Sequence, residues 1–156
     1  MTEKTEFNEK LRLCGIKAEN LEKVWDHVVE DIRETLVYSY DKFTVQDIFN
    51  SLKNMDMQLW VIVDQNNTIH ATIVTQIVDY PSKRVMLFVI ISGKNFVKWS
   101  HFLGLFTRFA RSHNCRSIEA YGRPGWENKT KKLGFKKIHT LYSLELTEGT
   151  THERNI

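Results

Sequence analysis

Hydrophobic residues in the first third of the chain recur at helical spacing. Between residues 21 and 36 an apolar side chain returns every three or four positions, with charged residues between, which predicts an amphipathic helix. Asn20 is a suitable N-cap for this helix. A second apolar stripe follows Thr44, and Asp47 stands three residues later, at the spacing of a capping box. Two helices are therefore expected within residues 18–54.

The pattern changes to that of strands in the middle of the chain. The runs 58–64 and 68–80 are rich in β-branched residues and are separated by turn-forming residues. The run 85–91 (VMLFVII) is apolar throughout, which is typical of a central strand buried on both faces. Because only short turns separate these three strands, they are expected to form an antiparallel meander.

A second helical pattern follows the meander. Aromatic and apolar residues between positions 96 and 112 recur at helical spacing. The short run 116–121 then predicts a strand parallel to 85–91, joined to it by a right-handed crossover through that helix. A short basic helix is expected at 126–133, ended by a glycine. Two last strands are expected at 135–138 and 140–146, before a polar tail.

Composition indicates one ordinary globular domain, but charge is unevenly distributed. The 156 residues are 42% hydrophobic and 26% charged, with a net charge of +3, which suits a single domain with its own core. Residues 1–80 hold 8 Lys or Arg against 14 Asp or Glu, whereas residues 81–156 hold 14 against 5. The basic half is therefore expected to receive any anionic ligand, unless the acidic excess is simply a solvated helix face.

Several classes of protein are disfavoured by the sequence. The start, residues 1–10, is too polar for a signal peptide, and no apolar run approaches the ~20 residues of a membrane span. Cys14 and Cys115 are isolated thiols, which favours a reducing cytoplasm. No metal site is expected, because the histidines are scattered without ligand spacing. They are His27, His70, His101, His113, His139 and His152.

The order of elements and one local motif resemble a known family. The sequence Lys132-Leu-Gly-Phe135 is similar to the late Y-x-K-L-G-F motif of the GNAT superfamily of N-acetyltransferases. The resemblance implies one GNAT-like α/β domain over residues 1–156, with a mixed, mostly antiparallel sheet of six or seven strands and flanking helices. Residues 10–16 are the candidate first strand. Residues 58–60 and 122–126 also resemble short GNAT-like proteins encoded by bacteriophages.

The resemblance implies acetyl-CoA as the cofactor and a place to hold it. In the family, the central strand offers its backbone to pantetheine, and the following loop binds the pyrophosphate with closely spaced glycines. Only Gly93 of those glycines is present here, although two lysines follow it. Lysine supplies charge without the close backbone approach that glycine permits. The implied cofactor-binding residues are Val89, Ile91, Gly93, Lys94, Asn95, Phe96 and Lys98.

The catalytic positions also depart from the family pattern. Many members have a tyrosine as general acid four residues before the late glycine, and here that position is Thr130, whose hydroxyl is a poor acid near neutral pH. The family's upstream asparagine corresponds to Arg123. Glu119 and Tyr121 alternate on a strand beside the presumed cleft. Glu119 is therefore the candidate base, acting through water with Tyr121 beside it, and the alternative is an ordinary solvent-facing pair.

A basic cluster surrounds the Leu-Gly-Phe turn and has three interpretations. It is a solvated face, a site for the 3′-phosphate of CoA, or a nucleic-acid contact surface in which Trp126 stacks on bases. The first is favoured, and nucleic acid is the least favoured. The lysines of the cluster are Lys129, Lys131, Lys132, Lys136 and Lys137.

Two functions remain open from the sequence. The first is an N-acyltransferase that uses acetyl-CoA and an amine acceptor of unknown identity, in the cytoplasm of the host cell. The second is a non-catalytic GNAT-fold phage protein that binds a phage or host protein or forms part of the virion. Neither function requires a membrane or a metal. Fold alone does not choose between them.

Overall fold

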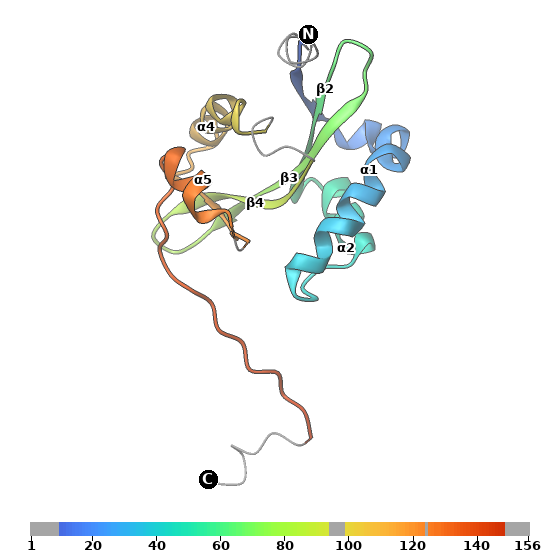
Figure 1. Cartoon of the computed structure of the whole chain (residues 1–156). Helices are drawn as coiled ribbons and strands as arrows, with labels where there is room; N and C mark the ends of the chain where they lie inside the picture. Colours follow the sequence, from blue (N-terminus) through green and yellow to red (C-terminus); the bar gives the residue numbers. More distant parts are fainter. Residues whose placement is uncertain (1–9, 94–98, 124, 149–156) are drawn as a thin grey trace, which may run out of the picture. The chain divides into compact units, whose positions relative to one another are not determined.

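A computed structural model describes residues 10–93, 99–123 and 125–148. Its five strands form one sheet in the order β1-β2-β3-β4-β5 (Figure 1). The first four pair antiparallel, and β5 runs parallel to β4. The expected meander, the first strand and the parallel pair are thus confirmed. The strands are β1 (Arg12–Ile16), β2 (Met57–Val63), β3 (Ile69–Asp79), β4 (Arg84–Gly93) and β5 (Ser117–Ala120).

The two N-terminal helices lie on one face of the sheet and α4 lies on the other (Figure 1). They are α1 (Leu21–Leu36), α2 (Val45–Lys53) and α4 (Leu103–Ser112), with single 3₁₀ turns at Ala18–Asn20 and Val37–Ser39. None of the helices among the described residues is both long and apolar enough to cross a membrane.

Each face of the sheet has its own packing. On the α1 and α2 face, Val28, Ile32 and Ile48 are fully buried against sheet residues such as Val74 and Ile90. On the α4 face the contacts are aromatic and edge-on, which is a favourable geometry for aromatic rings. There the ring centroid of Trp60 lies 5.3 Å from that of Phe106 and 4.8 Å from that of Phe109. The ring centroids of Phe88 and Phe106 are 5.1 Å apart.

The helix expected at 96–112 is interrupted in the structure. Residues 96–98 lie outside the described residues, Trp99 and Ser100 are helical, residues 101–102 form a turn, and α4 begins at Leu103. Trp99 and Phe102 are 3% and 9% exposed, so they are core residues. Their spacing belongs to the helical pattern in the sequence, although α4 starts after them.

The two strands expected at 135–138 and 140–146 are not formed. In the described part of the chain, residues 135–147 have neither strand nor helix assignments, so the sheet has five strands instead of six or seven. The apolar side chains of this segment beyond Phe135 are exposed; Tyr142 is 87% exposed and Leu146 76%. An alternating sequence favours a strand only when a partner completes its backbone hydrogen bonds.

The chain divides into two compact units, Met1–Arg123 and Pro124–Ile156. The second unit contains the short helix α5 (Glu127–Lys132). This helix was expected at 126–133, and Gly134 follows it with a φ of 92°, as expected for a terminating glycine.

Candidate functional site

The central strand β4 carries a bulge in its ladder with β3. Val74 pairs with Ile90 while Thr75 pairs with Phe88, so Val89 is an extra residue on β4. A bulge bends the strand and changes the direction of the side chains beyond it. Val89 packs against the core on the α1 and α2 face. One of the residues expected to hold the cofactor therefore lies at the bend of β4.

The strand β5 pairs with only the first half of β4. The parallel ladder joins Val85–Phe88 to Ser117–Ala120, whereas β4 continues to Gly93. Within the described residues, no strand pairs with the half from Val89 onward on the β5 side. Backbone groups of a sheet need partners, so this open half of β4, residues 89–93, is available to side chains or ligands.

Arg123 contacts the open half of β4. Its Nη2 donates a hydrogen bond of 3.1 Å to the carbonyl oxygen of Ile91. Its guanidinium carbon lies 4.1 Å from the ring centroid of Tyr38, in cation–π geometry. Tyr38 belongs to the connection between α1 and α2, so Arg123 joins that connection to β4.

Tyr121 makes a second contact with the same connection. It lies one residue beyond β5 and is 63% exposed, and the Nζ of Lys42 lies 5.1 Å from its ring centroid. Two cation–π pairs thus link the α1–α2 connection to the residues after β5. Tyr38 and Lys42 were not among the residues expected from the sequence. The signal available there was an aromatic pair, Tyr38 and Tyr40, placed just after the apolar helical stripe ends.

Glu119 lies beside the paired half of β4. It is opposite Leu87, and its Oε2 lies 3.6 Å from the Nζ of Lys83. Ile91 is four residues further along β4, roughly 13 Å for an extended strand. The structure therefore places Glu119 at some distance from Ile91 along β4, while Val89, Ile91 and Gly93 share the open half. Lys94, Asn95, Phe96 and Lys98 lie outside the described residues.

Gly93 ends β4 where its neighbour β3 approaches closely. A Cβ at this position would lie 3.1 Å from the Cβ of Ala71 and 3.1 Å from the carbonyl oxygen of His70. These distances are tighter than ordinary packing, so a side chain here would push β3 and β4 apart. Glycine at this position serves the close approach of the two strands.

The hydroxyl of Thr130 is engaged inside α5. It donates to the carbonyl oxygens of Trp126 and Glu127, at 3.0 and 3.1 Å. Such back-bonding is common for threonine within helices. The side chain at the position of the family's tyrosine is therefore used by its own helix.

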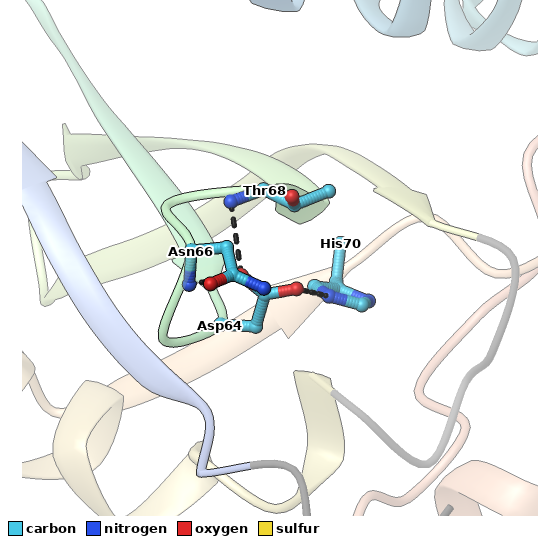
Figure 2. Close-up of polar contacts among 4 residues, drawn as sticks. All are labelled: Asp64, Asn66, Thr68 and His70. Atoms are coloured by element: carbon cyan, nitrogen blue, oxygen red, sulfur yellow. Dashed lines mark hydrogen bonds and ion pairs between the residues drawn. The ribbon is translucent and has the colours of Figure 1, made fainter.

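His70 forms a close pair with Asp64 at the turn between β2 and β3 (Figure 2). Its Nε2 lies 2.8 Å from Oδ2 of the carboxylate, whose Oδ1 accepts the backbone N–H groups of Asn66 and Thr68 at 2.8 and 3.0 Å. The hydrogen bond with His70, supplemented by those from Thr68 and Asn66, holds the pKa of Asp64 below its ordinary value. The pair therefore stabilises the turn.

Other potential sites are poor in the described residues. Among them, no group of three or more His, Cys, Asp or Glu residues could hold a metal ion. Burial raises the pKa of Cys115, so its thiol is a weak nucleophile. Two hollows, of about 840 and 410 Å³, lie near β1, β2 and α4, and none of the expected site residues lines them.

Comparison with known proteins gives matches only at the level of structure. No family model and no curated protein matches the chain. A predicted acetyltransferase from Clostridium acetobutylicum, solved with acetyl-CoA, is 16% identical with a TM-score of 0.67, over 90% of this chain and 99% of that one.

Two further solved structures are similar to this chain. A putative acetyltransferase from Pyrococcus furiosus is 12% identical with a TM-score of 0.67, over 88% of this chain and 100% of that one. Glucosamine-6-phosphate N-acetyltransferase from Arabidopsis thaliana is 11% identical with a TM-score of 0.63, over 89% and 100%. The fold of this chain is therefore that of the GNAT acetyltransferases.

Proposed function

We propose that this chain is an acyl-CoA-dependent N-acyltransferase with a degenerate pyrophosphate loop. The observation that carries the proposal is the central strand, which is bulged at Val89 and lacks a β5 partner from there to Gly93 among the described residues. An extended ligand rich in amides can use such a strand as it would use a sheet edge. The similar Clostridium structure contains acetyl-CoA, which supports this choice of cofactor.

The residues on the open half fit the proposed cofactor. The carbonyl oxygen of Ile91 accepts a hydrogen bond from a guanidinium at 3.1 Å, so a donor can reach it from that side. In this proposal the backbones of Val89 and Ile91 hold the amide part of the cofactor. The residues proposed for its diphosphate are Gly93, Lys94, Asn95, Phe96 and Lys98. Acetyl-CoA, when bound, supplies an activated acyl thioester.

The protein residues would act mainly by positioning an amine acceptor beside the cofactor and excluding water from it. Glu119 is the proposed base and would accept the amine's proton through water, with Tyr121 beside it. The ion pair between Glu119 and Lys83 keeps a cation next to this carboxylate. The acceptor class that we propose is a primary amine.

A non-catalytic role is the second candidate. Arg123 already donates a hydrogen bond to the carbonyl oxygen of Ile91, and the hydroxyl of Thr130 donates one to a backbone carbonyl at the start of α5. Both observations favour a GNAT-fold protein that has lost the chemistry, such as a phage-borne binding or virion component. That protein would bind a phage or host protein instead of turning over a substrate.

Titration calorimetry with acetyl-CoA and with CoA tests the first candidate. We expect saturable binding that Lys94→Glu weakens by about tenfold or more, equivalent to ~1.4 kcal/mol. Lys23→Glu makes the same charge change at an exposed position of α1 and is expected to bind as the wild type does. Absence of binding at millimolar concentrations of both ligands would reject the proposed cofactor.

A transfer assay with a panel of primary amines separates the two candidates. Acetylation that Glu119→Gln slows by roughly 10²-fold or more, with unchanged acetyl-CoA affinity, supports the enzyme and the proposed base. Binding of acetyl-CoA without turnover of any amine favours the non-catalytic candidate.

A further inference from the structure

Arg123 connects three parts of the structure around the open half of β4. It follows β5, it donates to the carbonyl of Ile91 at 3.1 Å, and its guanidinium stacks on Tyr38 at 4.1 Å. The second cation–π pair, between Lys42 and Tyr121, joins the same two loops. The α1–α2 connection and the loop after β5 are thus held together across β4.

The hydrogen bond from Arg123 uses the group that a strand ligand would need. Ile91 pairs with Ile73 of β3 on one side, and among the described residues no strand pairs with it on the other side. Its carbonyl oxygen accepts the hydrogen bond from Arg123. A donor that already occupies this oxygen competes with any amide N–H of a ligand lying along β4. The guanidinium is also charged, and charged donors make stronger hydrogen bonds than neutral amides do.

The stacking on Tyr38 orients this arginine. A guanidinium is planar, so contact with a ring face limits the directions in which its N–H groups can point. Tyr38 is 54% exposed, and the stacked arginine therefore lies in a region that molecules in solution can reach. Displacement of Arg123 requires loss of both the hydrogen bond and the ring contact.

We propose that Arg123 is a latch that controls access of the acyl donor to β4. In the latched state its guanidinium bridges Tyr38 and the Ile91 carbonyl, and the donor binds only after the side chain has swung away. This inference rests on the proposed function, because it concerns access to the cofactor position named there. In this proposal Arg123 weakens donor binding, whereas a residue that contacts the donor would strengthen it.

The first test compares acetyl-CoA binding by the wild type and Arg123→Ala. If the latched form makes up about 90% of the free protein, its removal strengthens the apparent affinity about tenfold. Arg123→Lys keeps the charge but lacks the planar guanidinium. Its affinity for acetyl-CoA is expected to lie between those of the wild type and Arg123→Ala. Arg116→Ala, an exposed arginine just before β5, is the matched control and is expected to leave affinity unchanged.

Weaker binding by Arg123→Ala would overturn the latch, because it would make Arg123 a ligand of the donor. Unchanged binding would also overturn it, since the contact would then be incidental. Binding by Arg123→Ala alone, with none by the wild type, would support it most directly. If no variant binds acetyl-CoA at millimolar concentration, both the access role and the proposed cofactor are rejected.

A second test needs no ligand and therefore separates the latch contact from the proposed function. The melting temperatures of Tyr38→Leu, Arg123→Ala and the double variant form a thermodynamic cycle. The latch predicts that the melting temperature of the double variant falls by less than the sum of the decreases in the two single variants. Additive losses would show that Tyr38 and Arg123 do not act together and would overturn the proposal, whatever the binding results.

Discussion

Asp64 shows how one carboxylate can organise a turn. One of its oxygens accepts two backbone N–H groups and the other contacts His70 (Figure 2). These bonds favour the charged carboxylate in the folded chain, which lowers its pKa. Because this pKa is lower in the folded state than in the unfolded state, the contribution of Asp64 to stability is present above the unfolded value. It is lost as the pH falls through the folded value.

We predict that Asp64→Asn changes how stability depends on pH. The free energy of unfolding of the variant should lie below that of the wild type near pH 6, and the two should converge as the pH falls below about 4, the ordinary pKa of aspartate. Urea unfolding followed by circular dichroism at a series of pH values measures this. Asp26→Asn, at an exposed position of α1, is the control. A constant difference at all pH values would contradict the prediction.

The positions expected near the cofactor come from the family resemblance and stay predictions. The structure places three of them, Val89, Ile91 and Gly93, on the half of β4 that β5 leaves unpaired. The contacts of Arg123 with Tyr38 and Ile91 could not be predicted. They join residues 85 and 32 positions apart in the chain, and only the packing of α1 and α2 against the sheet brings them together.

At the scale of elements, α2 is the clearest case of local sequence setting local structure. Thr44 and Asp47 form a full capping box, in which the threonine hydroxyl accepts the N–H of Asp47 at 3.1 Å and the carboxylate accepts the N–H of Thr44 at 2.8 Å. Both bonds satisfy helix N–H groups that otherwise have no partner within the helix. Asn20 holds the N-cap position of α1 without a side-chain bond, so only one of the two expected caps is made.

We predict that Thr44→Ala destabilises the protein by ~1 kcal/mol, because a capping hydroxyl is lost. Thr44→Ser retains the hydroxyl and should stay close to the wild type. Equilibrium urea unfolding of the three proteins gives the comparison. Equal losses for alanine and serine would mean that the methyl group of Thr44, and not its hydroxyl, stabilises the start of α2.

The elements that were predicted wrongly share a physical cause. Trp99 and Phe102 continue a helical spacing, and the apolar residues of 135–146 suit strands, but periodicity reports burial and not backbone hydrogen bonds. Trp99 is buried, although a turn at residues 101–102 separates it from α4. The segment 135–146 lacks ladder pairing in the described residues, although its side chains have strand propensity.

At the scale of the whole molecule, the chain consists of two units of unequal size. The sheet, with α1, α2 and α4, belongs to Met1–Arg123, and α5 with the following extended segment belongs to Pro124–Ile156. Large side chains of the extended segment are exposed, including Leu141 at 64% and Tyr142 at 87%. Exposed side chains contribute little to the stability of a fold.

We predict that a chain ending at Lys137 keeps the fold. Its melting temperature should fall by less than ~4 °C, the change that corresponds to roughly 1 kcal/mol for a domain of this size. Differential scanning calorimetry of the two chains measures the shift. Phe106→Ala, which leaves a cavity at a fully buried position, is the comparison. It should lower the free energy of unfolding by about 3–5 kcal/mol. A comparable loss on truncation would mean that the removed segment is packed.

The helices α1 and α2, the meander and the parallel return to β5 follow from the local sequence, because they depend on short-range periodicity and turn chemistry. The sequence also indicated the GNAT type of sheet through their order. Which half of β4 stays open follows from the folded chain, since that depends on where β5 stops pairing and on the bulge at Val89. The folded chain alone placed Arg123 on Ile91 and Tyr38, because contacts between distant segments arise from packing, which local patterns do not encode.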